Sequence, residues 1–221
     1  MLPLEKSPLV ALIAMCSFSF RGLVVSNLVG YNYAMNKNDM LNEAISFAAE
    51  AHKGAIRKLD KSPYILHPME TCVIAGTMTD DVNILAAALL HDTIEDAGVK
   101  KEEIREKFGD RVAQLVCAET ETKSNGWKKR KEDSIEELKK TTDLGVKIIW
   151  LSDKLSNLRS FVRMWRVKGA KLWDALNQND PAQQAWYYMS VADALRDMKD
   201  FEAYKEYKYL LKTIFTEYFN D

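Results

Sequence analysis

Apolar residues recur every three or four positions along most of the chain, and no segment alternates as a strand does. This period is that of an amphipathic helix. It is clear in residues 38–54, where Leu41 and Ile45 fall on the same face. We expect Asn38 or Asp39 to cap this first helix at its N-terminus.

Residues 82–92 are apolar nearly all round, which is typical of a buried helix, and Asp80 or Asp81 is its expected cap. Further helices are predicted at 67 onward, 101–108, 110 onward, 130–142, 145 onward, 181 onward and near the C-terminus. The predicted fold class is therefore all-α, a helical bundle of about eight to ten helices.

The first part of the chain has a different pattern. Leu9–Phe20 is an apolar run of twelve residues, whereas a helix that crosses a bilayer needs about 20. Met35 lies directly before the polar opening of the first predicted helix. We expect residues 1–34 to be an apolar leader outside the domain and residues 35–221 to be the domain. A membrane anchor or a signal segment is the other interpretation, although no convincing cleavage site follows the apolar run.

The composition narrows the range of partners. A chain of 221 residues suits one domain with its own hydrophobic core, and a net charge of −1 gives no general basic field that would recruit nucleic acid. We expect a small-molecule partner, no nucleic acid and no stable membrane partner; the oligomeric state stays open. Three cysteines without metal-finger spacing fit reduced thiols, so we expect a cytoplasmic protein.

Histidine is scarce in this chain, and His91 and Asp92 stand together at the end of the predicted buried helix. An imidazole nitrogen beside a carboxylate oxygen is a donor set for manganese, iron or zinc. Glu95 and Asp96 follow within one turn, and such carboxylates repel one another unless a cation or a shared proton is present. Asp153 is a further acidic residue on an apolar helix. It is either part of the same acidic site or the purely structural ion-pair partner of the adjacent lysine.

Five separated motifs occur in order: Ala51-His52-Lys53-Gly54, Arg57-Lys58, Pro63–Pro68, Ala87–Asp96 and Asp153–Leu158. Together they resemble the hydrolase domain of the RelA/SpoT superfamily over residues 38–162. At this chain length the resemblance is to a small alarmone hydrolase. It implies an HD-domain helical bundle with a metal-dependent phosphohydrolase site.

The resemblance also implies the residues of that site. It implies four metal ligands, His67, His91, Asp92 and Asp153. The ion in the family is manganese, one per site. Glu95 and Asp96 match the acidic pair that places or activates the attacking water, because a carboxylate near a cation can take the proton of that water.

The nucleotide contacts are implied in the same way. Arg57 and Lys58 match the pair beside the nucleotide, where a guanidinium plane can stack on a base and an ammonium can meet phosphate. Asn157 matches a ribose contact, one helical turn beyond the last predicted ligand. Two departures, Ala55 in place of the usual glutamine and Ala97 in place of a frequent threonine, remove no ligand and no proton carrier.

A basic stretch at residues 123–131 surrounds Trp127. It is either the solvated start of a helix or a phosphate-binding segment, and in the second case Lys123 and Arg130 are the expected contacts. His52 is expected to be a core histidine or a support of the site, not a ligand.

The leading functional hypothesis is manganese-dependent hydrolysis of the 3′-diphosphate of guanosine alarmones, which gives GDP or GTP and pyrophosphate. The second is a phosphohydrolase of another nucleotide, such as NADPH or a nucleoside monophosphate. The third is a non-catalytic alarmone-binding module, and the intact set of predicted ligands and acidic residues argues against it.

Overall fold

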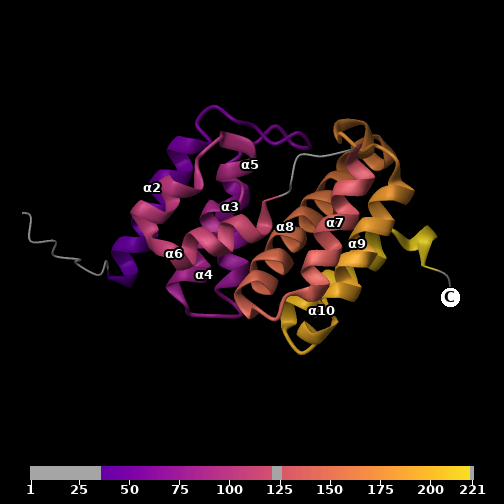
Figure 1. The fold of residues 1–221 in the computed structure, drawn as a ribbon. Helices are drawn as coiled ribbons and strands as arrows, with labels where there is room; N and C mark the ends of the chain where they lie inside the picture. Colours follow the sequence, from indigo (N-terminus) through magenta and orange to yellow (C-terminus); the bar gives the residue numbers. More distant parts are fainter. Residues whose placement is uncertain (1–35, 121–125, 220–221) are drawn as a thin grey trace, which may run out of the picture. The chain divides into compact units, whose positions relative to one another are not determined.

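The computed structural model describes residues 36–120 and 126–219, and the backbone in these ranges is helical apart from turns and one isolated bridge between Ile56 and Pro63 (Figure 1). The predicted all-α bundle is confirmed. The chain divides into two units after Ala34, and the described residues belong to the second unit. The predicted leader, residues 1–34, lies outside the described residues, so its role stays a prediction.

The α-helices, in chain order, are α2 (Lys37–Ala51), α3 (Leu66–Ala75), α4 (Val82–Leu90), α5 (Thr93–Ala97), α6 (Lys101–Glu119), α7 (Gly126–Lys140), α8 (Leu144–Lys168), α9 (Pro181–Ala194) and α10 (Glu202–Ile214). Short 3-10 helices at Gly169–Ala175, Arg196–Met198 and Thr216–Tyr218 follow α8, α9 and α10. Among the described residues, no helix is both long and apolar enough to cross a membrane.

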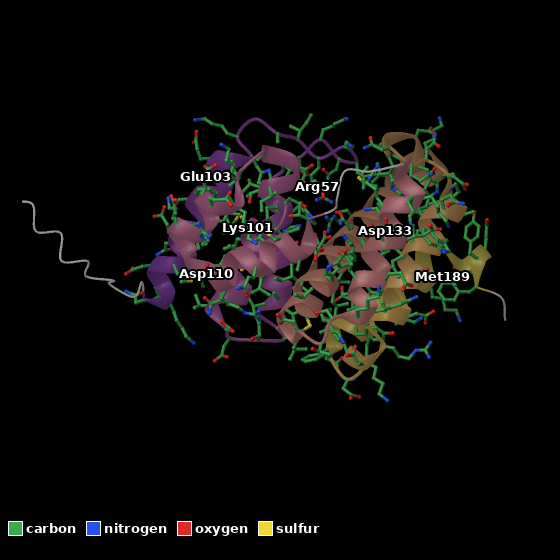
Figure 2. All side chains as sticks on the ribbon, viewed as in Figure 1. Arg57, Lys101, Glu103, Asp110, Asp133 and Met189 are labelled. Carbon is green, nitrogen blue, oxygen red and sulfur yellow. The ribbon has the colours of Figure 1, made fainter. Side chains whose placement is uncertain are left out.

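Helix α4 is the buried helix that the sequence predicted. It packs against α2, α3, α6 and α8, and its residues from Ala86 to Leu90 are almost fully inaccessible. Because these helices surround α4, its apolar pattern covers the whole circumference. The small alanine side chains allow the surrounding helices to approach closely. The outer helices are amphipathic by contrast: Lys101, Glu103 and Asp110 on α6 and Asp133 on α7 are all exposed (Figure 2).

Helix α8 is the element on which α3, α4, α6 and α10 all pack. Its apolar side chains are buried, but the helix also buries polar ones: Ser152, Asp153, Ser156 and Ser160. Their spacing keeps them near one face of the helix. Buried polar groups are costly unless they are hydrogen-bonded, so this polar stripe within the core marks the region where the chain places its chemistry.

Three helix starts differ from the prediction. Helix α2 begins at Lys37, because Asn36 accepts a hydrogen bond from the Asp39 N–H at 3.0 Å and is the true cap. Helix α3 begins at Leu66, so the predicted cap His67 lies inside its first turn, where the missing N–H of the next proline is tolerated. Helix α7 begins at Gly126 instead of residue 130, since the Trp127 ring packs against α9.

Replacing Asp143 with alanine is expected to lower the free energy of unfolding by about 1–3 kcal/mol. Asp143 caps α8 by accepting from the Gly145 N–H at 2.9 Å, and it also receives two hydrogen bonds from Arg111, at 2.6 and 2.8 Å. Urea unfolding measures the loss. The control is Asp180→Ala, which removes the α9 cap on the Ala182 N–H and should cost less.

The same pair gives the sign of a pH effect. The Arg111 guanidinium holds the pKa of Asp143 below its ordinary value. The stabilisation is therefore complete above the ordinary pKa of an aspartate and is lost as the pH falls through the lowered one. An Asp143→Ala protein as stable as the unsubstituted chain at neutral pH would contradict this role.

Candidate functional site

Three helices bring the predicted metal ligands together. His67 comes from the first turn of α3, His91 and Asp92 follow the end of α4, and Asp153 lies on α8. One ligand atom each from His67, His91 and Asp153 lie within 4.8 Å of one another. The Asp92 Oδ2 lies 3.1 Å from His91 Nε2 and 3.5 Å from His67 Nε2. The four side chains thus converge on one point.

The ring of His91 presents its Nε2 to this point. Its Nδ1 lies 2.8 Å from the carbonyl oxygen of Ala88, which can only accept, so Nδ1 carries a proton. The Nε2 is buried and has no hydrogen-bond partner among the described residues. Burial would lower the pKa of His91, but the carboxylates of Asp92, Asp153 and Glu119 outweigh it and raise that pKa to about 10. The field at Nε2 therefore favours a positive charge, whether a proton or a cation.

His67 is oriented in a similar way by a side chain. Its Nδ1 lies 2.9 Å from Ser156 Oγ, and this hydroxyl donates to Glu70 Oε2, also at 2.9 Å. A carboxylate can only accept, so the serine proton points to Glu70 and the serine oxygen accepts the Nδ1 proton of His67. Burial lowers the pKa of His67, which leaves the ring neutral with a lone pair on Nε2. That nitrogen faces Asp153 Oδ1 at 3.0 Å.

The donors fit a divalent metal ion. Two imidazole nitrogens and two carboxylates form the mixed nitrogen and oxygen set that zinc, manganese and iron accept. Lone pairs on His67 Nε2 and on the carboxylates meet in a buried space, an arrangement that is repulsive without a proton or a cation between them. The orphaned Nε2 of His91 points to the same requirement.

Asp153 is placed where it could fill both of the roles that the sequence left open. Burial would raise its pKa, but the ammonium of Lys154 holds the pKa of this carboxyl well below its usual range. Lys154 donates to Oδ2, whereas Oδ1 faces His67 and accepts from Asn157 Nδ2 at 2.7 Å. The structural partner and the ligand position therefore use different oxygens of the same side chain.

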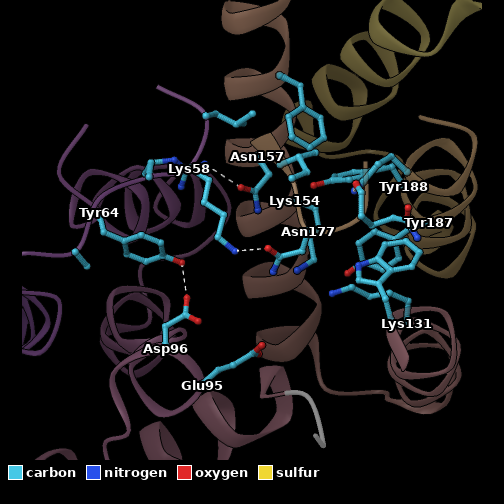
Figure 3. A pocket seen from close by; sticks show the side chains of 18 of the residues that line it. Lys58, Tyr64, Glu95, Asp96, Lys131, Lys154, Asn157, Asn177, Tyr187 and Tyr188 are labelled. Carbon is cyan, nitrogen blue, oxygen red and sulfur yellow. Dashed lines mark hydrogen bonds between the residues drawn. The ribbon is translucent and has the colours of Figure 1, made fainter. Parts of the chain in front are cut away.

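A cavity of about 530 Å³ lies beside this cluster (Figure 3). Its walls include six of the predicted site residues: Arg57, Lys58, Glu95, Asp96, Arg130 and Asn157. Buried Arg57 donates to Asn157 Oδ1 at 3.0 Å and to Ser160 Oγ at 3.3 Å, and Lys58 donates to Asn177 Oδ1 at 3.0 Å. The cavity thus has acidic groups near the ligand cluster and cationic groups elsewhere on its wall.

Tyr64 is a site residue to which the sequence assigned no role. Its hydroxyl lies 2.7 Å from Asp92 Oδ2 and 2.8 Å from Asp96 Oδ2 (Figure 3). The Tyr64 hydroxyl therefore lies between the ligand cluster and the acidic pair. Tyr64 lies within the Pro63–Pro68 motif, three residues before His67. Its place in that motif could have indicated that it belongs to the site. His52 packs its ring against Tyr64 at 4.8 Å and supports it, as expected of a non-ligand.

The basic stretch divides between its two interpretations. Arg130 and Lys131 line the cavity, whereas Lys129 forms an ion pair with Asp133 on the exposed side of α7. Lys123 lies outside the described residues, so its predicted contact stays a prediction. The aromatic residues Trp127, Tyr187 and Tyr188 also line the cavity.

Known proteins resemble this chain in sequence and in fold. The sequence matches the family described as HD domain over residues 44–176, which is more than half of the chain and includes every predicted ligand. The chain belongs to the HD domain family. The α9 and α10 segments lie beyond the matched HD domain residues.

Relatives of this HD protein carry informative names. It is 40% identical over 128 residues to a Xenopus tropicalis protein named guanosine-3′,5′-bis(diphosphate) 3′-pyrophosphohydrolase MESH1, a match that covers 56% of this chain and 70% of that protein. It is 35% identical over 127 residues to a Vibrio cholerae protein named guanosine-3′,5′-bis(diphosphate) 3′-pyrophosphohydrolase, which covers 55% of this chain and 18% of that protein. The HD protein thus spans only a small part of the long bacterial relatives.

Solved structures agree with the HD fold. A Listeria monocytogenes structure superposes with a TM-score of 0.63 at 30% identity and covers 68% of this chain and 99% of its own. A structure titled as a metazoan ortholog of SpoT that hydrolyzes ppGpp superposes with a TM-score of 0.64 at 29% identity, over 80% of this chain and 94% of its own. The resemblance found in the sequence motifs is confirmed at the level of family and fold.

Proposed function

We propose that this HD protein hydrolyses the 3′-diphosphate of guanosine alarmones and releases pyrophosphate, with GDP or GTP as the other product. The observation that carries the proposal is the cavity of about 530 Å³ that joins an acidic pair, Glu95 and Asp96, to Arg57 and Lys58 beside the cluster of His67, His91 and Asp153. A nucleotide with phosphates at two positions needs these elements: a cation site for one phosphoryl group, and positive side chains for the remaining charge.

The proposed division of labour follows from where each group lies. A bound divalent cation would polarise the 3′-phosphoryl group and lower the pKa of water. Glu95 or Asp96 takes the proton of the attacking water, whose oxygen bonds to the phosphorus as the bond to the ribose 3′ oxygen breaks. The ribose oxygen takes up a proton and leaves as the 3′-hydroxyl, and the diphosphate leaves as pyrophosphate. Tyr64 holds Asp96 in place through its 2.8 Å hydrogen bond. Arg57 and Asn157, already hydrogen-bonded to each other, offer a guanidinium face and an amide to base and ribose.

Manganese is the proposed ion, and His67, His91, Asp92 and Asp153 would hold it. The oxygen-rich half of this donor set suits a manganese ion, and the two imidazoles keep zinc and iron compatible with the site. The proposed location is the cytoplasm, with which the free thiols of Cys72 and Cys117 are compatible. The decisive test of the ion is metal-free protein that regains turnover on addition of manganese, with zinc, iron and magnesium as parallel additions.

The substrate is tested with a panel of nucleotides at saturating manganese. We expect a kcat/KM for guanosine 3′,5′-bis(diphosphate) at least about tenfold above that for NADPH, which corresponds to about 1.4 kcal/mol in transition-state binding. The released product should be pyrophosphate, not two separate phosphates, because the bond that breaks is the one to the ribose oxygen. Better turnover of NADPH or a nucleoside monophosphate would contradict the alarmone proposal and leave the metal site standing.

Arg57→Ala tests the recognition of the base within the same panel. The variant should lose preference for guanosine substrates and retain metal binding, because Arg57 contacts Asn157 and Ser160 and not the ligand cluster. Arg166→Ala on the exposed end of α8 is the control for a lost surface arginine. An unchanged substrate ranking in Arg57→Ala would contradict the proposed role.

A further inference from the structure

A hydrogen-bond chain begins at the buried predicted ligand His67 and ends at Glu70, whose side chain is partly exposed. Its first link joins His67 Nδ1 to Ser156 Oγ, and its second joins Ser156 Oγ to Glu70 Oε2, each at 2.9 Å. His67 is 3% exposed and Ser156 is fully buried. Water cannot substitute easily for a partner in such a place, so the direction of each hydrogen bond is set by the side chains themselves.

The far end of the chain is a fixed acceptor. Glu70 lies 3.4 Å from Arg159 and 3.7 Å from Arg163, so its carboxylate is paired with two arginines. Arg159 also binds Glu206 of α10 through two hydrogen bonds of 2.7 Å. Because a charged carboxylate accepts only, Ser156 must donate to Glu70 and accept from His67. The proton of the neutral imidazole is thereby kept on Nδ1.

We propose that Ser156 and Glu70 are positioning residues that fix the tautomer and ring orientation of His67 so that its Nε2 lone pair is available to a divalent cation. The inference rests on the proposed metal site. Without the acceptor, a neutral imidazole can move its proton to Nε2, the nitrogen that faces Asp153 at 3.0 Å. Groups that orient a ligating histidine in this way commonly contribute about 10–100-fold to metal affinity.

The hydrogen-bond chain from His67 to Glu70 joins two helices. Glu70 lies on α3, three residues after His67, and Ser156 lies on α8, three residues after Asp153. The serine thus reaches across the contact of α3 with α8 and ties the first-turn histidine of one helix to the helix that carries another ligand. Because Ser156 is fully buried, a larger side chain at this position would not fit without moving its neighbours.

The test measures the tautomer and the metal affinity separately. The chain has three histidines, so nitrogen-15 NMR of histidine-labelled, metal-free protein resolves each ring. We expect His67 in the unsubstituted protein to carry its proton on Nδ1, and Ser156→Ala to populate the Nε2–H form. Titration with manganese should show an affinity about 10–100-fold weaker in Ser156→Ala. Excess manganese should restore most of the turnover.

The control is Ser152→Ala. Ser152 is also fully buried on α8, but its hydroxyl donates to the Ile148 carbonyl of its own helix, so both readouts should stay unchanged. Glu70→Gln is the second variant: its amide can donate to Ser156 and reverse the chain, which should also populate Nε2–H and weaken manganese binding.

Two outcomes would overturn the inference: unchanged manganese affinity in both Ser156→Ala and Glu70→Gln, or weaker affinity with His67 still protonated on Nδ1. If the unsubstituted protein binds no divalent ion, the proposed metal site fails instead, and this result is distinguishable because it needs no variant. Circular dichroism of each variant establishes that the helical fold is intact before the two readouts are compared.

Discussion

Asp153→Ala is expected to abolish turnover and to weaken binding of the divalent cation by more than about 100-fold, beyond the usual effect of losing a supporting group. The substitution removes the Oδ1 that faces His67 and also the partner of Lys154. The ammonium of Lys154 then stays buried beside the cation site, where it repels a divalent ion. Metal content by mass spectrometry and turnover with added manganese measure the two losses.

Two further variants sharpen this experiment. His91→Ala should also lose metal and turnover, because it removes the Nε2 that faces the site. It does so with Lys154 still paired, so the loss cannot come from an unpaired ammonium. Asp174→Ala, which removes an exposed aspartate, should change neither metal content nor turnover. Full activity of the Asp153→Ala protein, or of the unsubstituted protein in excess chelator, would show that the reaction does not use this site.

The double variant Glu95→Gln/Asp96→Asn is expected to retain metal and nucleotide binding but to lose turnover by about 10²–10⁴-fold, the usual contribution of a positioned proton acceptor. Both residues line the cavity, and Figure 3 shows Asp96 directed at Tyr64 and Glu95 directed toward α8. The glutamine and asparagine side chains have nearly the same size as the acids that they replace, but they cannot take a proton from water. Single-turnover kinetics at saturating manganese separate the chemical step from binding.

The single variants show which residue carries the proton. Tyr64 can donate its only proton to one acceptor at a time, so Asp96 competes with Asp92 for that hydrogen bond. If Glu95→Gln alone accounts for the loss, Asp96 acts mainly by holding Tyr64 and water. Loss of bound manganese from the double variant would instead make the pair ligands or structural supports and would contradict the proposed role.

Most of the residues that meet in the candidate site lie in compact sequence motifs. His91, Asp92, Glu95 and Asp96 fall within two turns of chain, and the buried helix before them was evident from its apolar composition. The meeting of these residues with Asp153 came from resemblance to a family. Spacing along the chain gave no reason to bring a residue of α8 to the end of α4.

What the sequence did not predict depends on contacts between distant segments. Ser156 and Glu70 are 86 residues apart, and Arg57 and Asn157 are 100 apart, so no local pattern reports either pair. The early start of α7 has the same origin, since the Trp127 ring extends the helix by packing on α9. Local propensity predicts that a helix forms more reliably than it predicts where the helix begins or ends, because tertiary packing can add or remove a turn.

The length of α8 limits how this protein can be altered by insertion or deletion. Helix α8 has 25 residues and spans about 37 Å, and one continuous hydrogen-bond ladder fixes the angular positions of Asp153, Ser156 and Asn157. One residue inserted between Gly145 and Asp153 would turn all three by about 100° relative to the α8 N-terminus. Changes of length outside α8 leave the angular positions of these three residues on the helix unchanged. A seven-residue insertion within α8, close to two full turns, would change those angular positions less than a single residue does.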